Sequence, residues 1–214
     1  MLFSPPILKH GDLVQILSTA RVATIEDVAD AVELLESWGL RVKLGSTIGR
    51  VCNQFAGTDE ERAHDLQQAL DCSETKAIFC ARGGYGTNRI LDRISFSGFM
   101  KHPKWVIGFS DVTFLHLHLN FMLGVRTIHS FMAALTKKTS QAAKEALRSI
   151  LFGEKVSYHF NPHPFNKIGK ATAMLCGGNL SILYASTGTQ LVINSAGSVC
   201  FLKILTSIYI TLTV

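Results

Sequence analysis

The sequence has few charged residues, no block of like charge and no long apolar run. Of its 214 residues, 17% are charged and 47% are apolar, which is enough to form a packed core and excludes a disordered or fibrous chain. The net charge is +5, but the basic residues are scattered, so we do not expect nucleic-acid binding. The most apolar segment, Val199 to Val214, contains Lys203 and is too short for a membrane-spanning helix. Because the N-terminus also lacks a signal-peptide pattern, we expect a cytoplasmic protein with no membrane contact.

Cysteine pairs and metal-ligand spacings are also missing. The five cysteines are odd in number and include no CxxC pair, so reduced, buried thiols are expected rather than disulfides or a zinc site. No nucleotide-binding fingerprint occurs either. The sequence therefore predicts a protein with no cofactor and no bound metal.

A regular alternation of strand and helix patterns fills most of the chain. Short apolar runs typical of buried parallel strands lie at 13–17, 40–44, 77–80, 105–107 and 125–128. Helical patterns follow them at 28–38, 58–70, from 87, from 111 and at 140–151, and a capping box, Thr58 to Glu61, opens the second. This alternation predicts an α/β fold in which an N-terminal doubly wound parallel sheet is flanked by helices.

A change in composition divides the chain into parts. Residues 153–170 are polar and rich in turn-forming residues, which predicts a linker. We therefore expect an N-terminal α/β domain over residues 1–152, which carries the candidate sites. Residues 171–214 are expected to form the incomplete start of a smaller, β-rich C-terminal domain.

The first candidate site is the turn Arg82-Gly83-Gly84-Tyr85-Gly86, between a predicted strand and a helix. Ligands of doubly wound sheets bind at the carboxyl ends of strands, and glycines there let backbone amides approach a ligand oxygen. The turn is neither a P-loop nor a GxGxxG motif. A tight turn without a ligand is the alternative.

The second candidate site is Gly108-Phe109-Ser110-Asp111-Val112, at the same place after the next predicted strand. A serine in such a turn exposes its hydroxyl above the sheet, and the following amide faces the oxyanion of a tetrahedral intermediate. Val112 stands where the hydrolase elbow motif has its second glycine, so the match is partial. A helix cap at Ser110 or Asp111 is the alternative.

A serine nucleophile needs a general base, and none of the eight histidines is an obvious one. His116 and His118 are two residues apart on a predicted helix, so they cannot share a face and are expected to be solvent-facing or boundary residues. His129 follows a strand at its carboxyl end, where site residues gather. Polar lining is its alternative role.

Ordered motifs over residues 5–202 point to a family. They are Pro6-Ile7-Leu8-Lys9-His10-Gly11-Asp12, Phe55-Ala56-Gly57-Thr58 with Arg62 and Asp65-Leu66, Ala81-Arg82-Gly83-Gly84-Tyr85-Gly86, Gly108-Phe109-Ser110-Asp111, His129, and Gly177-Gly178-Asn179-Leu180. Together they resemble the LD-carboxypeptidases, serine peptidases that include muramoyl-tetrapeptide carboxypeptidases and microcin-immunity hydrolases.

The resemblance implies a cytoplasmic hydrolase of peptidoglycan recycling that removes the terminal D-alanine from a murein tetrapeptide or a related small peptide, and it suggests a homodimer. It implies that Ser110 is the nucleophile and that the amides of Gly84 and Asp111 form the oxyanion hole. The residues that it implies for substrate binding are Arg82, Gly83, Tyr85 and His129. Of these, Arg82 is suited to pair with a substrate carboxylate.

The family's base and its carboxylate partner are expected from the second domain, as a glutamate in a Phe-Leu-Glu-Asp-like segment and a later histidine. Here that segment reads Phe201-Leu202-Lys203-Ile204, and the residues up to Val214 supply neither group. One possible choice of codons for Lys203 to Val214 encodes a different segment if a single lost G is restored before codon 203. That segment reads Glu-Asp-Ile-Asp-Glu-Tyr-Ile-Tyr-His-Ile-Asp-Arg, which resembles the family's continuation. We therefore hypothesise a one-base deletion that truncates the domain, with impaired activity and poor solubility. A true short variant and a weakly membrane-attracted tail are the alternatives.

Two other functions stay open from the sequence. A non-catalytic module that binds anionic peptides on the glycine turns would tolerate Ser110→Ala, whereas a peptidase would not. An esterase of the hydrolase fold would need a histidine base that the sequence does not reveal.

Overall fold

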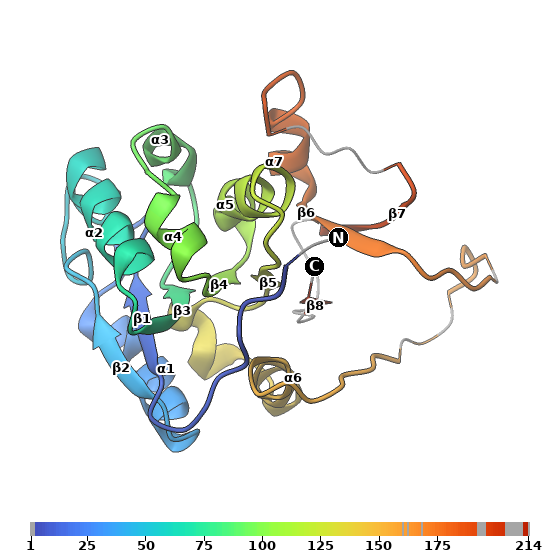
Figure 1. Cartoon of the computed structure of the whole chain (residues 1–214), viewed down its shortest axis with the longest axis horizontal. Coiled ribbons are helices and arrows are strands. Elements are labelled where there is room, and N and C mark those ends of the chain that lie inside the picture. Colours follow the sequence, from blue (N-terminus) through green and yellow to red (C-terminus); the bar gives the residue numbers. More distant parts are fainter. Residues whose placement is uncertain are drawn as a thin grey trace.

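A computed structural model describes residues 3–159, 161, 163–167, 169–191, 196–203 and the backbone of 212–213. Its centre is a sheet in the order β2-β1-β3-β4-β5-β8, in which the first five strands are parallel and β8 is antiparallel to β5 (Figure 1). The strands are β1 (Leu13–Leu17), β2 (Arg41–Leu44), β3 (Thr75–Cys80), β4 (Trp105–Gly108), β5 (Ile128–His129) and β8 (Leu212–Thr213). The predicted parallel α/β fold is confirmed.

Helices cover both faces of this sheet, so its central strands are buried almost throughout. One face packs against α1 (Ile25–Ser37) and α6 (Gln141–Leu151), and the other against α2 (Asp59–Asp71), α3 (Thr87–Leu91), α4 (Ser97–Lys101) and α5 (Thr113–Leu117) (Figure 1). Successive residues of a strand contribute their side chains alternately to the two cores. Phe79 lies in the first cluster, whereas Ile78 and Cys80 lie in the second.

Side-chain caps fix where the two longest helices begin. The predicted capping box of Thr58 and Glu61 opens α2, and each side chain bonds the other residue's backbone amide. Thr24 and Asp27 form a second box at the start of α1. The second box was not predicted because Asp27 stands where the pattern has Glu or Gln.

A second, two-stranded parallel sheet lies beyond β5. It pairs β6 (Met174–Asn179) with β7 (Ser198–Lys203), and α7 (Leu180–Ala185) lies between them in the chain (Figure 1). The described residues between α6 and β6 form neither helix nor strand. The domain boundaries drawn above stay a prediction. The proposed frame change begins at Lys203, and residues 204–211 and 214 lie outside those described.

The structure tests two further expectations, that the cysteines are reduced and buried and that the chain has no membrane-spanning helix. All five cysteines are free, but only Cys80 and Cys176 are buried. Cys200 is exposed and lies on β7, none of whose residues is buried. The prediction of uniformly buried thiols was therefore wrong. Among the described residues, no helix combines the length and the apolar character needed to cross a membrane.

Candidate active site

The site lies where the strand order reverses. Chain order runs outward from β1 to β2 on one side and through β3, β4 and β5 on the other, so the crevice beside β1 and β3 is a topological switch point. Ligands of open parallel sheets bind at the carboxyl ends of strands in such a crevice. Both predicted turns meet there, after β3 and after β4.

Ser110 sits in a strained turn directly after β4. Its φ is +58°, in the left-handed region, where a residue with a Cβ is held at a cost of about 1–3 kcal/mol. The turn is tight because a Cβ on Gly108 would lie 3.0 Å from Val112, and the Val112 amide donates to the Phe109 carbonyl at 3.2 Å. This is the conformation of a nucleophile elbow, in which a strand, a sharp turn and a helix expose one side chain. Val112 fills the space that a second glycine would leave open.

The glycine turn packs directly against Ser110. A Cβ built on Gly83 would lie 3.4 Å from the Ser110 Cβ and 3.2 Å from Met132. Gly84 and Gly86 have φ of +113° and +147°, so the backbone here needs glycine for its conformation as well as for space. The structure therefore brings together Ser110 and the glycine turn that the sequence singled out separately.

Arg82 and Tyr85, at the rim of the glycine turn, are half-exposed. Arg82 donates to the Val22 carbonyl at 3.0 Å and lies 3.5 Å from the Asp27 carboxylate at the start of α1. The Tyr85 ring contacts the Phe55 ring, with centroids 6.2 Å apart. Their predicted roles in substrate binding stay predictions.

His129 lies behind the nucleophile turn. It is only 4% exposed, its ring neighbours are Phe109, His116 and Phe201, and neither ring nitrogen has a hydrogen-bond partner among the described residues. Burial, with smaller contributions from His116 and Lys203, lowers the pKa of His129 to about 3. In this environment the imidazole is neutral and a weak base.

His116 is also buried, contrary to the expectation of a solvent-facing or boundary residue. Its Nε2 donates to the Gly108 carbonyl at 2.9 Å, and burial lowers its pKa to about 4. His118, two residues on, is half-buried and stacks on Phe96 at 4.3 Å. Spacing correctly separated the two faces, but α5 is enclosed between the sheet and α7, so its inner face is core.

The second sheet reaches the nucleophile turn at two points. The Asn179 amide donates to Thr113 Oγ1 at 3.3 Å, and a Cβ on Gly178 would lie 2.6 Å from the Thr113 side chain. Lys203 Nζ lies 5.0 Å from the centroid of the Phe109 ring, and burial lowers the pKa of this lysine. Within the described residues, no side chain hydrogen-bonds the Ser110 hydroxyl, and no group of acidic, histidine and cysteine side chains could hold a metal.

Three supporting residues at the site were not assigned roles from the sequence. Thr19 follows β1 and shares a hydrogen bond with Thr87 at 2.8 Å, while Arg21 packs its side chain over Gly84. Arg62, fully buried on α2, donates to the carbonyls of Thr19 and Gly86. Arg62 was visible in the sequence only as part of a family motif, because two of its partners, Thr19 and Gly86, come from distant segments.

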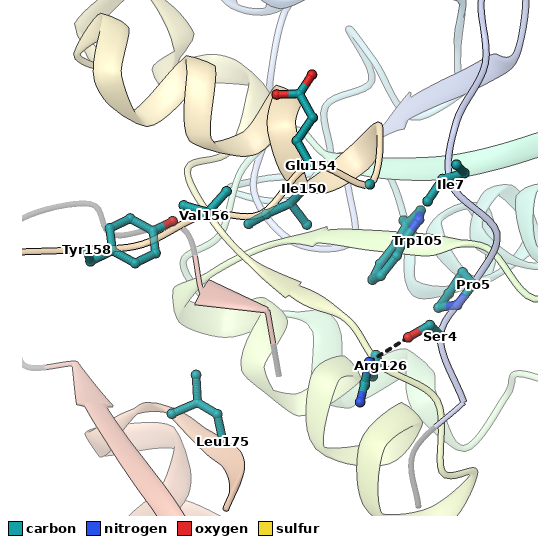
Figure 2. A pocket seen from close by; sticks show the side chains of 11 residues that line it. Ser4, Pro5, Ile7, Trp105, Arg126, Ile150, Glu154, Val156, Tyr158 and Leu175 are labelled. Atoms are coloured by element: carbon teal, nitrogen blue, oxygen red, sulfur yellow. Dashed lines mark hydrogen bonds between the residues drawn. The ribbon is translucent and has the colours of Figure 1, made fainter. Parts of the chain in front are cut away.

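Two of the cavities formed by described residues lie outside these turns. The first cavity, of about 460 Å³, opens at the opposite edge of the sheet, where Trp105 begins β4 (Figure 2). Its wall includes Ser4, Pro5, Ile7, Ile150 and Arg126. Arg126 donates a hydrogen bond to Ser4 Oγ. The other, of about 510 Å³, lies between α3, α5 and the segment after α7, with Asn88, Phe114 and Gln190 in its wall. Since α3 and α5 start at the two candidate turns, only the second cavity adjoins the site.

Comparison with known families decides the relationship. The sequence model of the LD-carboxypeptidase N-terminal domain matches residues 14–130, which is more than half of the chain and includes both turns. The chain belongs to the LD-carboxypeptidase family. The resemblance drawn from the ordered motifs is thereby confirmed.

Curated relatives of this LD-carboxypeptidase family member agree. A probable murein peptide carboxypeptidase of Bacillus subtilis is 34% identical over 206 residues, which cover 94% of this chain and 65% of the relative. The murein tetrapeptide carboxypeptidase of Pseudomonas aeruginosa is 29% identical over 194 residues, covering 84% and 61%. The chain thus spans less than two thirds of the length of these relatives.

Solved structures share the fold of this LD-carboxypeptidase family member. An MccF-like protein from Bacillus anthracis superposes with a TM-score of 0.81 at 21% identity, covering 94% of this chain and 69% of that one. Muramoyltetrapeptide carboxypeptidase from Oxalobacter formigenes gives 0.75 at 24% identity, covering 89% and 65%. At these identities the likeness establishes the fold alone.

Proposed function

We propose that this chain is a serine-type LD-carboxypeptidase that removes the terminal D-alanine from a murein tetrapeptide during peptidoglycan recycling in the cytoplasm. The observation that carries the proposal is the left-handed conformation of Ser110, at the carboxyl end of a buried parallel strand and against Gly83. Family membership supports the peptidase class, and the names of the murein peptide carboxypeptidases support the substrate class.

In the proposed reaction, Ser110 Oγ attacks the carbonyl carbon of the last peptide bond. The tetrahedral oxyanion accepts hydrogen bonds from the amides of Gly84 and Asp111. The C–N bond then breaks as the leaving nitrogen takes up the proton that Ser110 lost, and D-alanine is released. Water hydrolyses the acyl-enzyme. Gly83 gives the peptide room to approach Ser110, Arg82 pairs with a substrate carboxylate, and Tyr85 and His129 complete the lining. We also propose that the chain forms a homodimer.

Proton transfer is the step that this chain performs poorly in our proposal. The Ser110 proton must go to a base, but no described side chain accepts a hydrogen bond from its hydroxyl, and His129 has a pKa of about 3. Loss of one triad member typically leaves only the residual rate that the oxyanion hole and binding provide. We therefore expect slow turnover by the 214-residue chain.

The test measures D-alanine release from a murein tetrapeptide by three proteins. They are the 214-residue chain, its Ser110→Ala variant, and a version with the reading frame restored at codon 203. We expect slow release by the first, none above background by the second, and release at least a hundredfold faster by the third. Release that is unchanged by Ser110→Ala would contradict the proposal. A peptide-binding module without catalysis, which would keep its affinity in Ser110→Ala, is not favoured by family membership.

A further inference from the structure

One peptide unit of the glycine turn is held at both of its polar ends by buried charged side chains. The carbonyl of Gly86 accepts a hydrogen bond from Arg62 Nη1 at 3.0 Å. The amide of Thr87, in the same peptide bond, donates to Asp111 Oδ2 at 2.8 Å. Arg62 is fully buried and Asp111 is 1% exposed, so little solvent competes for either contact. Hydrogen bonds to charged groups are short and roughly twice as strong as neutral ones.

These contacts join the two turns of the candidate site. Asp111 directly follows Ser110, whereas Thr87 directly follows the glycine turn and is the first residue of α3. The Asp111 side chain is therefore a strut between the nucleophile turn and the glycine turn. Arg62 holds the other end of the peptide and is itself fixed by Asp59 and by the Thr19 carbonyl. Gly86 leaves room for it, since a Cβ there would lie 2.8 Å from Arg62 Nη1.

We infer that the Asp111 carboxylate is a positioning residue, which with Arg62 fixes the glycine turn relative to Ser110 so that the amides of Gly84 and Asp111 converge on one oxyanion. The inference rests on the proposed function, because it assumes that these amides act in catalysis. It assigns the Asp111 side chain a task separate from that of its backbone amide. Donors of an oxyanion hole work only when held in place beforehand, and a displacement of about 1 Å can cost roughly a hundredfold in rate.

The molecule contains a matched control for this strut. Asp65, also 1% exposed, accepts hydrogen bonds from the amides of Ser46 and Thr47 at 3.1 and 2.9 Å, in the turn after β2. It too is a buried carboxylate that ties a helix to a turn. Among the described residues, no hydrogen bond joins Asp65 or its turn directly to Ser110 or to the glycine turn. The turn reaches the end of β1 instead, where Thr47 Oγ1 accepts from the Ser18 amide at 2.9 Å. A general loss of stability should therefore follow from changing either aspartate, but a loss of oxyanion binding only from changing Asp111.

The experiment uses the full chain and a peptide boronic acid whose boron replaces the carbonyl carbon of the scissile bond. Ser110 Oγ bonds to boron, the serine proton leaves to the buffer, and the resulting tetrahedral anion mimics the transition state without needing turnover. Affinity is measured by calorimetry, and boron NMR verifies the tetrahedral adduct. The same peptide with a carboxamide in place of the boronic acid measures ordinary binding.

We expect Asp111→Ala to weaken boronate binding about 30- to 100-fold and carboxamide binding less than about threefold. Asp111→Asn should stay within about threefold for both ligands, because its amide oxygen can accept the same hydrogen bond. Asp65→Ala should also stay within about threefold for both. The inference is overturned if Asp111→Ala keeps its boronate affinity, or if Asp65→Ala loses as much. If Asp111→Ala does not show a sharp unfolding transition, and so is not properly folded, Asp111→Leu replaces it, because leucine is of similar size and has no hydrogen-bond acceptor.

Two controls separate this inference from the proposed function. If Ser110→Ala binds the boronic acid as tightly as the parent chain, or the parent forms no adduct, the proposed function fails. The strut is still tested by hydrogen exchange of the Thr87 amide, read by NMR. We expect Asp111→Ala to speed this exchange at least tenfold relative to Asp65→Ala, and equal rates in the two variants would overturn the inference.

Discussion

The two sheets of this protein bury their residues very differently. In the parallel sheet, every residue of β4 and all but one of β3 are buried, because helices cover both faces. In the second sheet, no residue of β7 is buried, and Leu202 is 50% exposed. Among the described residues from Met174 onward, Ile182 and Leu191 pack against a core cluster, the one that lines α2 to α5.

This difference suggests that the two sheets have different tasks, one in stability and the other at the candidate site. The two turns of the candidate site follow strands of the parallel sheet directly, whereas the second sheet contacts the nucleophile turn and the start of α5, at Phe109 and Thr113. We therefore expect the parallel sheet and its helices to provide most of the folding free energy. Substitutions in the second sheet are expected to affect the site more than the stability. Four predictions test this division.

The largest effect is expected from the buried core. Phe79 is a fully buried residue of β3 whose ring packs against that of Phe131. Phe79→Ala should lower the free energy of unfolding by about 3–5 kcal/mol. Leu202→Ala, in β7, should cost less than about 0.5 kcal/mol. Urea unfolding followed by tryptophan fluorescence measures both, since Trp38 and Trp105 are buried in the first region. Equal costs would contradict the division.

The next effect concerns the buried arginine of α2. Arg62→Met keeps the apolar bulk but leaves the buried Thr19 carbonyl without its donor. It also removes one donor each from the Gly86 carbonyl and from Asp59, which both keep a hydrogen bond from Arg89, so we expect a loss of about 1–3 kcal/mol. Urea unfolding provides the measurement. Arg93→Met, which removes an exposed ion pair with Glu60, is the control and should cost less than about 1 kcal/mol. A similar loss in both variants would show that burial is not the cause.

A smaller effect depends on pH. Burial lowers the pKa of His129 to about 3 and of His116 to about 4, from an ordinary 6.5. Between these values and 6.5 the unfolded chain binds more protons than the folded one, so stability falls as the pH falls, by up to about 1.4 kcal/mol per pH unit for each histidine. His129→Phe should reduce the slope of stability against pH between 6 and 5 by roughly 1 kcal/mol per pH unit, the share of one histidine. An unchanged slope in His129→Phe would show that other groups cause the pH dependence.

The smallest effect on stability is expected at exposed apolar residues. Val199→Lys in β7 and Ile25→Lys in α1 should each change the unfolding free energy by less than about 0.5 kcal/mol. Only Val199→Lys should raise the concentration at which light scattering detects aggregation, because it places a charge on an exposed strand. An equal gain from Ile25→Lys would mean that net charge alone is responsible.

Local patterns predicted the elements of the parallel sheet well. Short apolar runs located β1, β3 and β4, and the Thr58–Glu61 box located the start of α2, because these signals act between neighbours in the chain. The expected strand at 125–128 is only Ile128–His129, since Val125 instead bridges to Phe3 at the N-terminus. The parallel pairing of β6 with β7 was not predicted, because it joins segments about 24 residues apart.

The sequence by itself determined the α/β class, the family and the two turns of the candidate site, because glycine spacing and strand-to-helix transitions are visible in consecutive residues. Only the tertiary structure decided that these turns touch, that Ser110 is left-handed, and that His116 and His129 are enclosed. It alone also placed Arg62 and Asp111 on the two ends of one peptide bond. Such contacts depend on strand order and on helices packing across the sheet, and residues so distant in the chain leave no pattern that a single sequence could reveal.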